Sequence, residues 1–303
     1  MSVNDTERLR RELLLRAMFP TMTRDALVRF AEQAQPLSVA TGETVFERGS
    51  PPDTIYFVRE GRVTMEAEGE TAWTFGPRSV VGVIDAMIGR PRARSCVATQ
   101  DSQLLSLAVS EWLDLLEYDS NTARGSIRNF ALQVHRRWPA WASATPALEE
   151  PHPRASTPSP LSTYDKILAL RRAAFLRPAG MQAIASLAMI AEEESLEAGQ
   201  VLFPIGSEMS TLRMIVSGNV LLTSENGVSV VQTAGALLGG PAALSGAPTV
   251  YSARAVTPAR LLRVHEQDYY DQIEEHVRLA RSTLSYLVAE FERVLVRAPP
   301  TAP

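Results

Sequence analysis

The side chains best placed to do chemistry lie between Gly82 and Ser95, in the stretch GVIDAMIGRPRARS. Three arginines alternate there with other residues, at Arg90, Arg92 and Arg94. Guanidinium groups pair with anionic oxygens in a planar, bidentate way. The plainer interpretation is an arginine-rich solvated face, in which Arg92 stabilises a surface turn.

This stretch has a copy further along the chain, GGPAALSGAPTVYS from Gly239 to Ser252. The offset is 239 − 82 = 157 residues, and it holds without a gap over most of both halves. The same offset pairs Gly42 with Gly199, Phe46 with Phe203, Gly49 with Gly206, Gly61 with Gly218, Val63 with Val220, Gly89 with Gly246, Pro91 with Pro248 and Ala98 with Ala255. Paired glycines imply paired backbone geometry, because turns need positive φ or close backbone approach. The sequence therefore predicts one fold used twice.

The bulk properties describe an ordinary globular protein. A chain of 303 residues has room for two domains, and 45% hydrophobic with 21% charged residues is typical of such chains. The net charge of −4 argues against a protein that coats nucleic acid. The single cysteine, Cys96, excludes an internal disulfide framework and is expected in the core. No apolar run is long enough to predict a membrane span, and the N-terminus lacks the features of a secretory signal. We expect a cytoplasmic location.

Hydrophobic periodicity gives the order of the elements. Apolar spacing predicts helices over 6–18 and over 23–34, the second capped by Thr23. Short runs of β-forming residues follow from Leu37, separated by Gly and Pro, and a helix is expected from Glu111 to Trp138. The pattern then restarts at Asp165, with helices expected at 166–176, 180–190 and 266–297 and strands between 194 and 264.

The chain between the two halves is rich in Pro, Ser, Thr and Ala, which indicates a linker. The predicted layout is a first domain at 1–138, a linker at 139–163, a second domain at 164–298 and a disordered tail at 299–303.

Several motifs together resemble the cyclic nucleotide-binding domain family. Gly42 and Gly49 flank a strand as in its first turn, while YFVREGRV (56–63) and LRMIVSGNV (212–220) are similar to its central signature. The family includes catabolite activator protein-like proteins and regulatory subunits of protein kinase A, and the tandem layout resembles the latter. The resemblance implies an α+β, mainly β fold: two eight-stranded jelly-roll-like β-rolls, each flanked by helices and followed by a long helix.

The repeated stretch is similar to the phosphate-binding cassette of that family. The resemblance implies that a cyclic phosphate is received by backbone N–H groups and by one arginine, while a glutamate accepts from the ribose 2′-OH. In the first copy the candidate cassette residues are Gly82, Val83, Arg92, Ala93 and Ser95, for cyclic AMP or cyclic GMP. Arg92 stands at the arginine position, but Val83 occupies the glutamate position and cannot accept a hydrogen bond. Asp85 lies two residues on and need not face the same way.

The second copy departs further from the family pattern. Gly240 stands at the glutamate position and Thr249 at the arginine position. Losing one charge-assisted hydrogen bond costs about 1.5–3 kcal/mol, or about one to two decades of affinity. We therefore expect cyclic nucleotide binding in the first roll alone.

Enzyme chemistry finds little support in the sequence. Metal-dependent oxygenases on eight-stranded rolls need converging histidines and a carboxylate. The four histidines have no ligand spacing, and each is expected to be exposed or to cap a helix: His135, His152, His265 and His276. We expect no bound metal and no catalytic residue.

The last helix carries a heptad seam of Val277, Ala280, Leu284, Leu287, Phe291 and Val294. The offset maps it onto Ser120, Ala123, Ile127, Phe130, Val134 and Arg137, where the arginine interrupts the seam. The two helices could pair within one chain, the last helix could pair with its copy in a second chain, or each could pack on its own roll. Trp138 and Trp141, which end the first helix, fit a cap on a bound base or ordinary packing against the linker equally well.

Taken together, these features predict a non-enzymatic cytoplasmic regulatory or sensor protein. Its output would pass through the long helices to a protein partner or to a homodimer formed along Val277–Val294. No recognition helix follows either long helix, so we expect no direct nucleic-acid binding. The alternative is a ligand-free scaffold with two vestigial pockets.

Overall fold

The computed structural model describes residues 11–12, 14–16, 22–138 and 160–297. They belong to two compact units, of which the first takes in the chain up to Ser126 together with Leu295 onward, and the second runs from Ile127 to Val294. The units therefore divide inside helix α5 (Ser120–Arg136), so most of that helix belongs with the second roll. The domain limits at 138 and 164 remain predictions.

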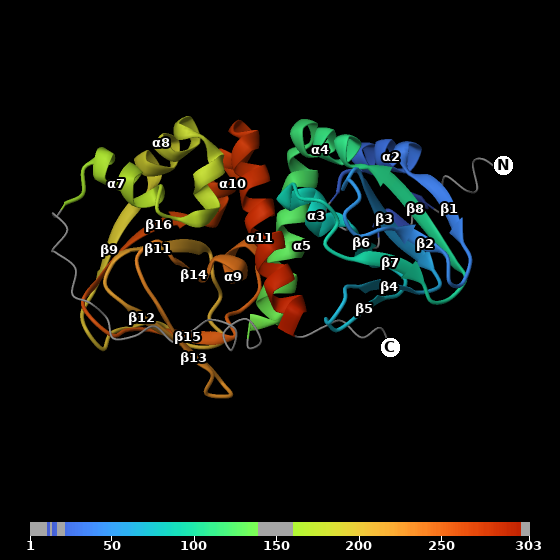
Figure 1. The fold of residues 1–303 in the computed structure, drawn as a ribbon. Coiled ribbons are helices and arrows are strands. Elements are labelled where there is room, and N and C mark those ends of the chain that lie inside the picture. Colours follow the sequence, from blue (N-terminus) through green and yellow to red (C-terminus); the bar gives the residue numbers. More distant parts are fainter. Residues whose placement is uncertain (1–10, 13, 17–21, 139–159, 298–303) are drawn as a thin grey trace. The chain divides into compact units, whose positions relative to one another are not determined.

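The first unit is a β-roll of eight strands in two antiparallel sheets (Figure 1). One sheet has the order β1-β8-β3-β6 and the other β2-β7-β4-β5. The strands are β1 (Gln35–Val39), β2 (Thr44–Phe46), β3 (Thr54–Glu60), β4 (Val63–Glu66), β5 (Trp73–Phe75), β6 (Val80–Val81), β7 (Ser95–Ala98) and β8 (Ser102–Ala108). The helices are α2 (Arg24–Gln33), α3 (Val83–Ile88), α4 (Val109–Tyr118) and the start of α5.

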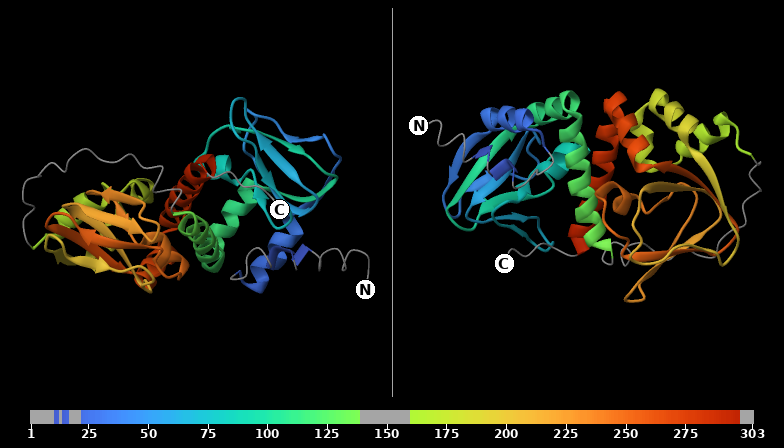
Figure 2. Two further views of the ribbon diagram at one scale, coloured as in Figure 1. Left: turned by 90° about the horizontal axis from the view of Figure 1, so that it is seen from below. Right: turned by 180° about the vertical axis from the view of Figure 1, so that it is seen from behind.

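The second unit repeats this topology, with sheets β9-β16-β11-β14 and β10-β15-β12-β13. Seen from below and from behind, its strands wrap into a roll beside their own helices (Figure 2). The strands are β9 (Glu192–Leu196), β10 (Val201–Phe203), β11 (Thr211–Ser217), β12 (Val220–Ser224), β13 (Ser229–Gln232), β14 (Leu237–Leu238), β15 (Tyr251–Ala255) and β16 (Ala259–His265). The helices are α7 (Thr163–Leu170), the 3-10 helix η1 (Ala174–Ala179), α8 (Met181–Ile190), α9 (Gly240–Ser245), α10 (Glu266–Glu275) and α11 (Val277–Arg297).

The offset of 157 holds element by element. It carries the first residues of β1, α3 and α5 onto those of β9, α9 and α11. Gly61 and Gly218 show why glycine recurs: both have positive φ, and a Cβ at either would overlap the backbone after β7 or β15. The predicted tandem of eight-stranded rolls is confirmed.

The core of the first roll forms where amphipathic helices meet alternating strands. Thr23 caps α2 as predicted, its hydroxyl accepting from Ala26 N at 3.3 Å. Phe30 on the buried face of α2 meets the rings of Phe57 and Trp112 edge-to-face, at 5.2 and 5.6 Å between centroids. The helix predicted over 6–18 lies largely outside the described residues; 11–12 and 14–16 are helical, and Leu15 is buried.

Both long helices predicted as single elements are broken. The expected helix 111–138 is α4 and α5, separated at Asp119, whose carboxylate accepts from Asn121 N at 3.2 Å and from the Thr122 hydroxyl at 2.6 Å. A carboxylate that binds the next turn in this way ends one helix and caps another. The expected helix 266–297 is α10 and α11, separated at His276, whose φ of −131° and ψ of 85° are not helical.

The helical cover of the second roll also differs from the prediction. The helix expected over 166–176 ends at Leu170 and is followed by η1, which contains Pro178; α8 matches the predicted 180–190. The end of the predicted linker belongs to this roll, because Leu161 is buried and Ser162 forms a capping box with Asp165. No described helix is long and apolar enough to cross a membrane.

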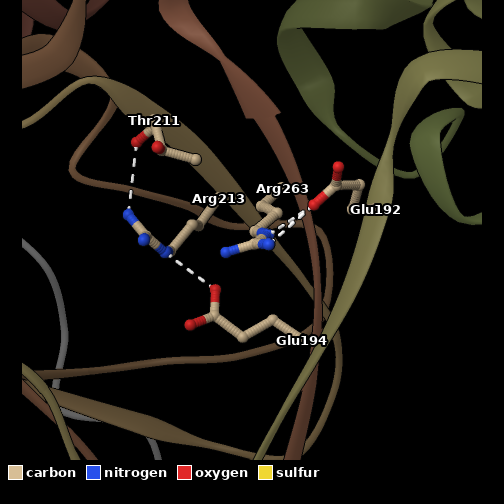
Figure 3. Close-up of polar contacts among 5 residues, drawn as sticks. All are labelled: Glu192, Glu194, Thr211, Arg213 and Arg263. Atoms are coloured by element: carbon tan, nitrogen blue, oxygen red, sulfur yellow. Dashed lines mark hydrogen bonds and ion pairs between the residues drawn. The ribbon is translucent and has the colours of Figure 1, made fainter.

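The exposed edge of the second roll carries a row of ion pairs (Figure 3). Glu192 and Glu194 on edge strand β9 pair with Arg263 on β16 and Arg213 on β11, at 2.6 and 2.9 Å. Glu193 pairs with Arg260 of β16. Charges along an edge strand discourage pairing with other strands.

Candidate functional site

The first cassette, residues 82–95, is a loop and short helix between β6 and β7. Gly82 precedes α3 with φ 81° and Gly89 follows it with φ 77°, both left-handed. Gly239 and Gly246 bracket α9 in the second roll in the same way, each with φ 69°. Both cassettes therefore share one backbone, and their chemistry differs through the side chains alone.

Arg92 is the central side chain of the first cassette, and it is buried, with 2% of its surface exposed. Its Nη1 donates to the carbonyl of Gly82 and its Nη2 to the carbonyl of Thr54 on β3. The guanidinium carbon lies 4.5 Å from the centroid of the Phe46 ring. The interpretation of Arg92 as a surface arginine is wrong: the side chain joins the cassette to both sheets of the roll.

The charge of Arg92 has no carboxylate partner among the described residues. Burial lowers the pKa of the Arg92 guanidinium, while the more distant charge of Asp85 and the hydroxyl of Tyr56 raise it. The Nε–H is buried without an acceptor. A guanidinium has five N–H donors, and the two carbonyls take two of them. The side chain thus keeps donors directed at no protein acceptor.

The other candidate residues surround Arg92 without completing the family pattern. Val83 is buried in the first turn of α3. Asp85 accepts from Arg90 Nε at 2.8 Å and from Ala93 N at 3.3 Å, so both hydrogen bonds of its carboxylate are made to other residues of the cassette. It therefore does not replace the acceptor missing at Val83.

Ser95 lies at the far end of the cassette. Its hydroxyl accepts from Arg48 N at 2.9 Å, which fixes the turn after β2. Gly82 and Arg92 are thus in direct contact, Ala93 is joined to them through Asp85, and Ser95 holds the neighbouring turn.

Two aromatic contacts at this cassette were not anticipated. Phe46 stacks on Tyr56 with centroids 5.8 Å apart, and burial raises the pKa of the Tyr56 hydroxyl. Arg94, 4% exposed, lies 4.0 Å over the Trp73 ring and pairs with Glu70. The arginine-rich stretch is therefore not a solvated face. Strand alternation could have placed Phe46 and Tyr56 in the roll, but nothing local indicates their partners.

The second cassette is filled by side chains of its own roll. The Tyr251 hydroxyl accepts from Gly239 N at 3.2 Å, and the Thr249 hydroxyl donates to Pro204 O at 3.0 Å. The Met209 methyl lies against Gly239, and a Cβ at Gly240 would overlap Leu237. Burial raises the pKa of Tyr251 to about 12. These groups make their contacts within the roll itself.

The end of α5 lies against this second cassette. Trp138, 4% exposed, stacks on Tyr251 with centroids 4.5 Å apart and planes 29° apart. His135 is buried, and its Nε2 lies 2.8 Å from the carbonyl of Pro248. The prediction of an exposed or capping histidine is wrong for His135, and Trp138 has a partner that neither sequence interpretation named. Trp141 lies outside the described residues.

The other histidines and the cysteine can be placed as follows. His265 caps α10 as predicted, and His276 Nε2 lies 3.3 Å from the Ser186 hydroxyl. His152 lies outside the described residues. Cys96 is in the core as expected, and burial raises its pKa to about 12, which suppresses thiolate chemistry. No group of three or more metal-ligating side chains occurs among the described residues.

Within the second compact unit, the part of α5 after Ser126 meets α11 (Figure 2). Phe130 meets Phe291 edge-to-face at 6.1 Å, and Arg137 lies 5.5 Å from the centroid of the same ring. Arg137 thus extends the seam through a cation–π contact. Pairing of α11 with a second chain stays a prediction, and it would need Leu284 and Leu287, both buried, to leave their present contacts.

Comparison with known proteins agrees with this fold. A family model described as the cyclic nucleotide-binding domain matches residues 36–119 and 193–276, which is more than half of the chain. No curated protein matches the chain.

The solved structures to which the chain is similar are distant in sequence. The regulatory domain of Toxoplasma gondii PKA with cAMP is 13% identical over 96% of this chain and 98% of that one, with a TM-score of 0.37. The regulatory subunit of a cAMP-independent protein kinase A from Trypanosoma brucei is 15% identical over 92% of this chain and 88% of that one, with a TM-score of 0.36.

Proposed function

Because the chain belongs to the cyclic nucleotide-binding domain family, with two copies in tandem, we propose that it is a non-enzymatic regulatory protein whose first roll alone binds a ligand. The ligand is an anion of the cyclic nucleotide type, and cyclic AMP and cyclic GMP are the first compounds to test. The one observation that carries the proposal is the buried Arg92 guanidinium, which has no carboxylate partner among the described residues.

A bound phosphate would supply what Arg92 lacks. An uncompensated buried charge is unfavourable, and an anion of opposite charge relieves it. The unused Nε–H could donate to a phosphate oxygen while the Gly82 and Thr54 carbonyls keep their donors. Val83 offers nothing to the ribose 2′-OH, so the affinity is expected to be about one to two decades below that of a site with glutamate there.

Ligand entry would be coupled to a change of conformation. Arg92 is 2% exposed, so an anion reaches its donors only after the covering backbone moves. That backbone includes the turn before β3, where Arg92 N donates to Ser50 O at 3.0 Å and Gly49 N donates to Arg92 O at 2.8 Å. A ligand with higher affinity for the opened state shifts the population toward it. We propose that this shift reaches a protein partner through the long helices.

The test is calorimetric titration of the full chain with cyclic AMP and cyclic GMP, and with adenosine and guanosine, which lack the phosphate. Saturable binding of a cyclic nucleotide, lost in Arg92→Ala and weakened in Arg92→Lys, supports the proposal. Thr249→Ala is the matched control, since it changes the equivalent position of the second roll and should leave binding unaltered.

Two outcomes would contradict this function. Equal affinity for a nucleoside and its cyclic phosphate would remove the role of Arg92 as an anion receptor. No heat from any compound with folded protein would favour the scaffold alternative, in which both cassettes are structural and partners contact the helices.

A further inference from the structure

One face of α5 and the residue two positions beyond it lie along the cassette loop of the second roll. Arg128, Ala131 and His135 of α5 and Trp138 after it recur at helical spacing, and the last three are buried. Their neighbours follow one another along the loop. A Cβ at Gly246 would lie 3.0 Å from Arg128 Nη2. His135 contacts the carbonyl of Pro248, and Trp138 stacks on Tyr251. All of these residues belong to the second compact unit.

The loop has the lining of a site for a flat aromatic group. Tyr251 has two further contacts: its hydroxyl accepts from Gly239 N, and the centroid of its ring lies 5.9 Å from that of Phe203. Trp138 lies on the Tyr251 ring in a stacked geometry, which aromatic pairs favour. The offset of 157 maps Tyr251 and Thr249 onto Arg94 and Arg92, so the second cassette has a tyrosine and a threonine where the first has two arginines. An anion site and an uncharged aromatic site thus share one backbone.

We propose that the second cassette is a binding site for an indole ring and that its ligand is Trp138 of the same chain. The Tyr251 ring is the surface on which the indole stacks, and the Pro248 carbonyl orients α5 by accepting a hydrogen bond from His135. A tethered ligand is present at a high effective concentration, so the site stays occupied without any free ligand. The segment from His135 to Trp138, at the end of α5 and just beyond it, is thereby held to the second roll. This inference does not depend on nucleotide binding by the first roll.

The experiment removes the internal ligand and returns it in free form. In Trp138→Gly, amide hydrogen exchange of residues 127–138 should become about tenfold faster than in the natural chain, the loss expected from one stacked aromatic pair. Added indole should bind saturably to Trp138→Gly and restore the protection, while the natural chain binds none. Cyclohexanol, a saturated ring of similar bulk to the six-membered ring of indole, should not substitute for it.

A second substitution tests whether indole stacks on the Tyr251 ring. Tyr251→Leu placed in the Trp138→Gly chain keeps an apolar side chain but removes the ring, so indole binding should fall about tenfold or more. Indole affinity unchanged by Tyr251→Leu, or equal rescue by cyclohexanol, would show a nonspecific cavity and overturn the proposal.

Two milder variants keep the test decisive if Trp138→Gly does not fold. Trp138→Phe retains an aromatic ring for stacking, whereas Trp138→Leu retains only apolar volume. The proposal expects protection of residues 127–138 to stay near the natural level with phenylalanine and to fall about tenfold with leucine. Equal protection in the two variants would contradict an aromatic site.

Discussion

The two cassettes of this chain share a backbone and differ in what lines it. Left-handed glycines bracket a six-residue helix in each, at Gly82 and Gly89 and again at Gly239 and Gly246. In the first, a buried arginine without a carboxylate partner lies at the centre; in the second, Thr249 and Tyr251 bind the neighbouring backbone. The comparison shows that glycines at the same positions keep one loop backbone while the side chains that line it differ.

The largest expected effect comes from removing the central side chain of each cassette. Arg92→Leu leaves the carbonyls of Gly82 and Thr54 without donors, and we expect a loss of about 2–4 kcal/mol in the free energy of unfolding. Thr249→Val, the matched change, should cost about 1–2 kcal/mol, because it removes a neutral hydroxyl that binds Pro204 and Ser207. Urea denaturation measures both. A smaller loss for Arg92→Leu than for Thr249→Val would mean that Arg92 is not a structural link between cassette and sheet.

A second comparison restores the acceptor that both cassettes lack. Val83→Glu should raise the affinity of the first roll for a cyclic nucleotide about 10- to 100-fold, since the carboxylate can accept from the ribose 2′-OH. Gly240→Glu, its counterpart, should give no binding, because a side chain there overlaps Leu237. Calorimetry of the two variants, with Val83→Gln as the uncharged control, measures the difference. Binding by Gly240→Glu would show that the second pocket is open after all.

A third test measures how stability depends on pH through His135, which contacts Pro248 of the second cassette. Burial lowers the pKa of His135 from its ordinary 6.5, adjacent Arg136 lowers it further, and the Pro248 carbonyl opposes both. The unfolded chain therefore takes up this proton first as the pH falls. The contribution of neutral His135 to stability is complete above pH 6.5 and is lost as the pH falls through the lowered pKa of the folded state.

His135→Gln is the control for this pH effect, because its amide can donate to Pro248 without titrating. Urea denaturation of both chains between pH 5 and pH 8 gives their free energies of unfolding. The difference between the two at each pH is the contribution of His135 titration. Parallel curves for the natural chain and His135→Gln would exclude a role for His135 protonation.

The sequence predicted the backbone far better than the side-chain partners. The repeat at 157 residues depends on glycines and prolines, whose backbone requirements are local, so it located both cassettes. The number of strands in each roll came from the family resemblance. The breaks at Asp119 and His276 were missed because the apolar periodicity continues through them. At Asp119 a single capping side chain decides the interruption.

The partners of Arg92 and Trp138 could not be read from the chain. Arg92 binds a carbonyl 38 residues away, and Trp138 stacks on a ring beyond a long segment rich in proline. An arginine between other arginines is typical of a surface, and only the distant carbonyls of the roll make its burial favourable. Pairing Tyr251 with Arg94 through the offset could have indicated that an uncharged side chain takes the place of an arginine in the second loop.

The smallest effect should come from the edges of the two rolls, which are built differently. Edge strand β9 uses the ion pair of Glu192 with Arg263, whereas β1 uses a neutral hydrogen bond of 3.0 Å from Ser38 to Gln103. Glu192→Gln should lower the free energy of unfolding by about 0.2–1 kcal/mol at low ionic strength, as is usual for exposed pairs. In 1 M salt the Debye length is about 3 Å, so this difference should vanish, while the effect of Ser38→Ala should not change. A salt-independent loss for Glu192→Gln would mean that its hydrogen bonds, and not its charge, hold β9 to the sheet.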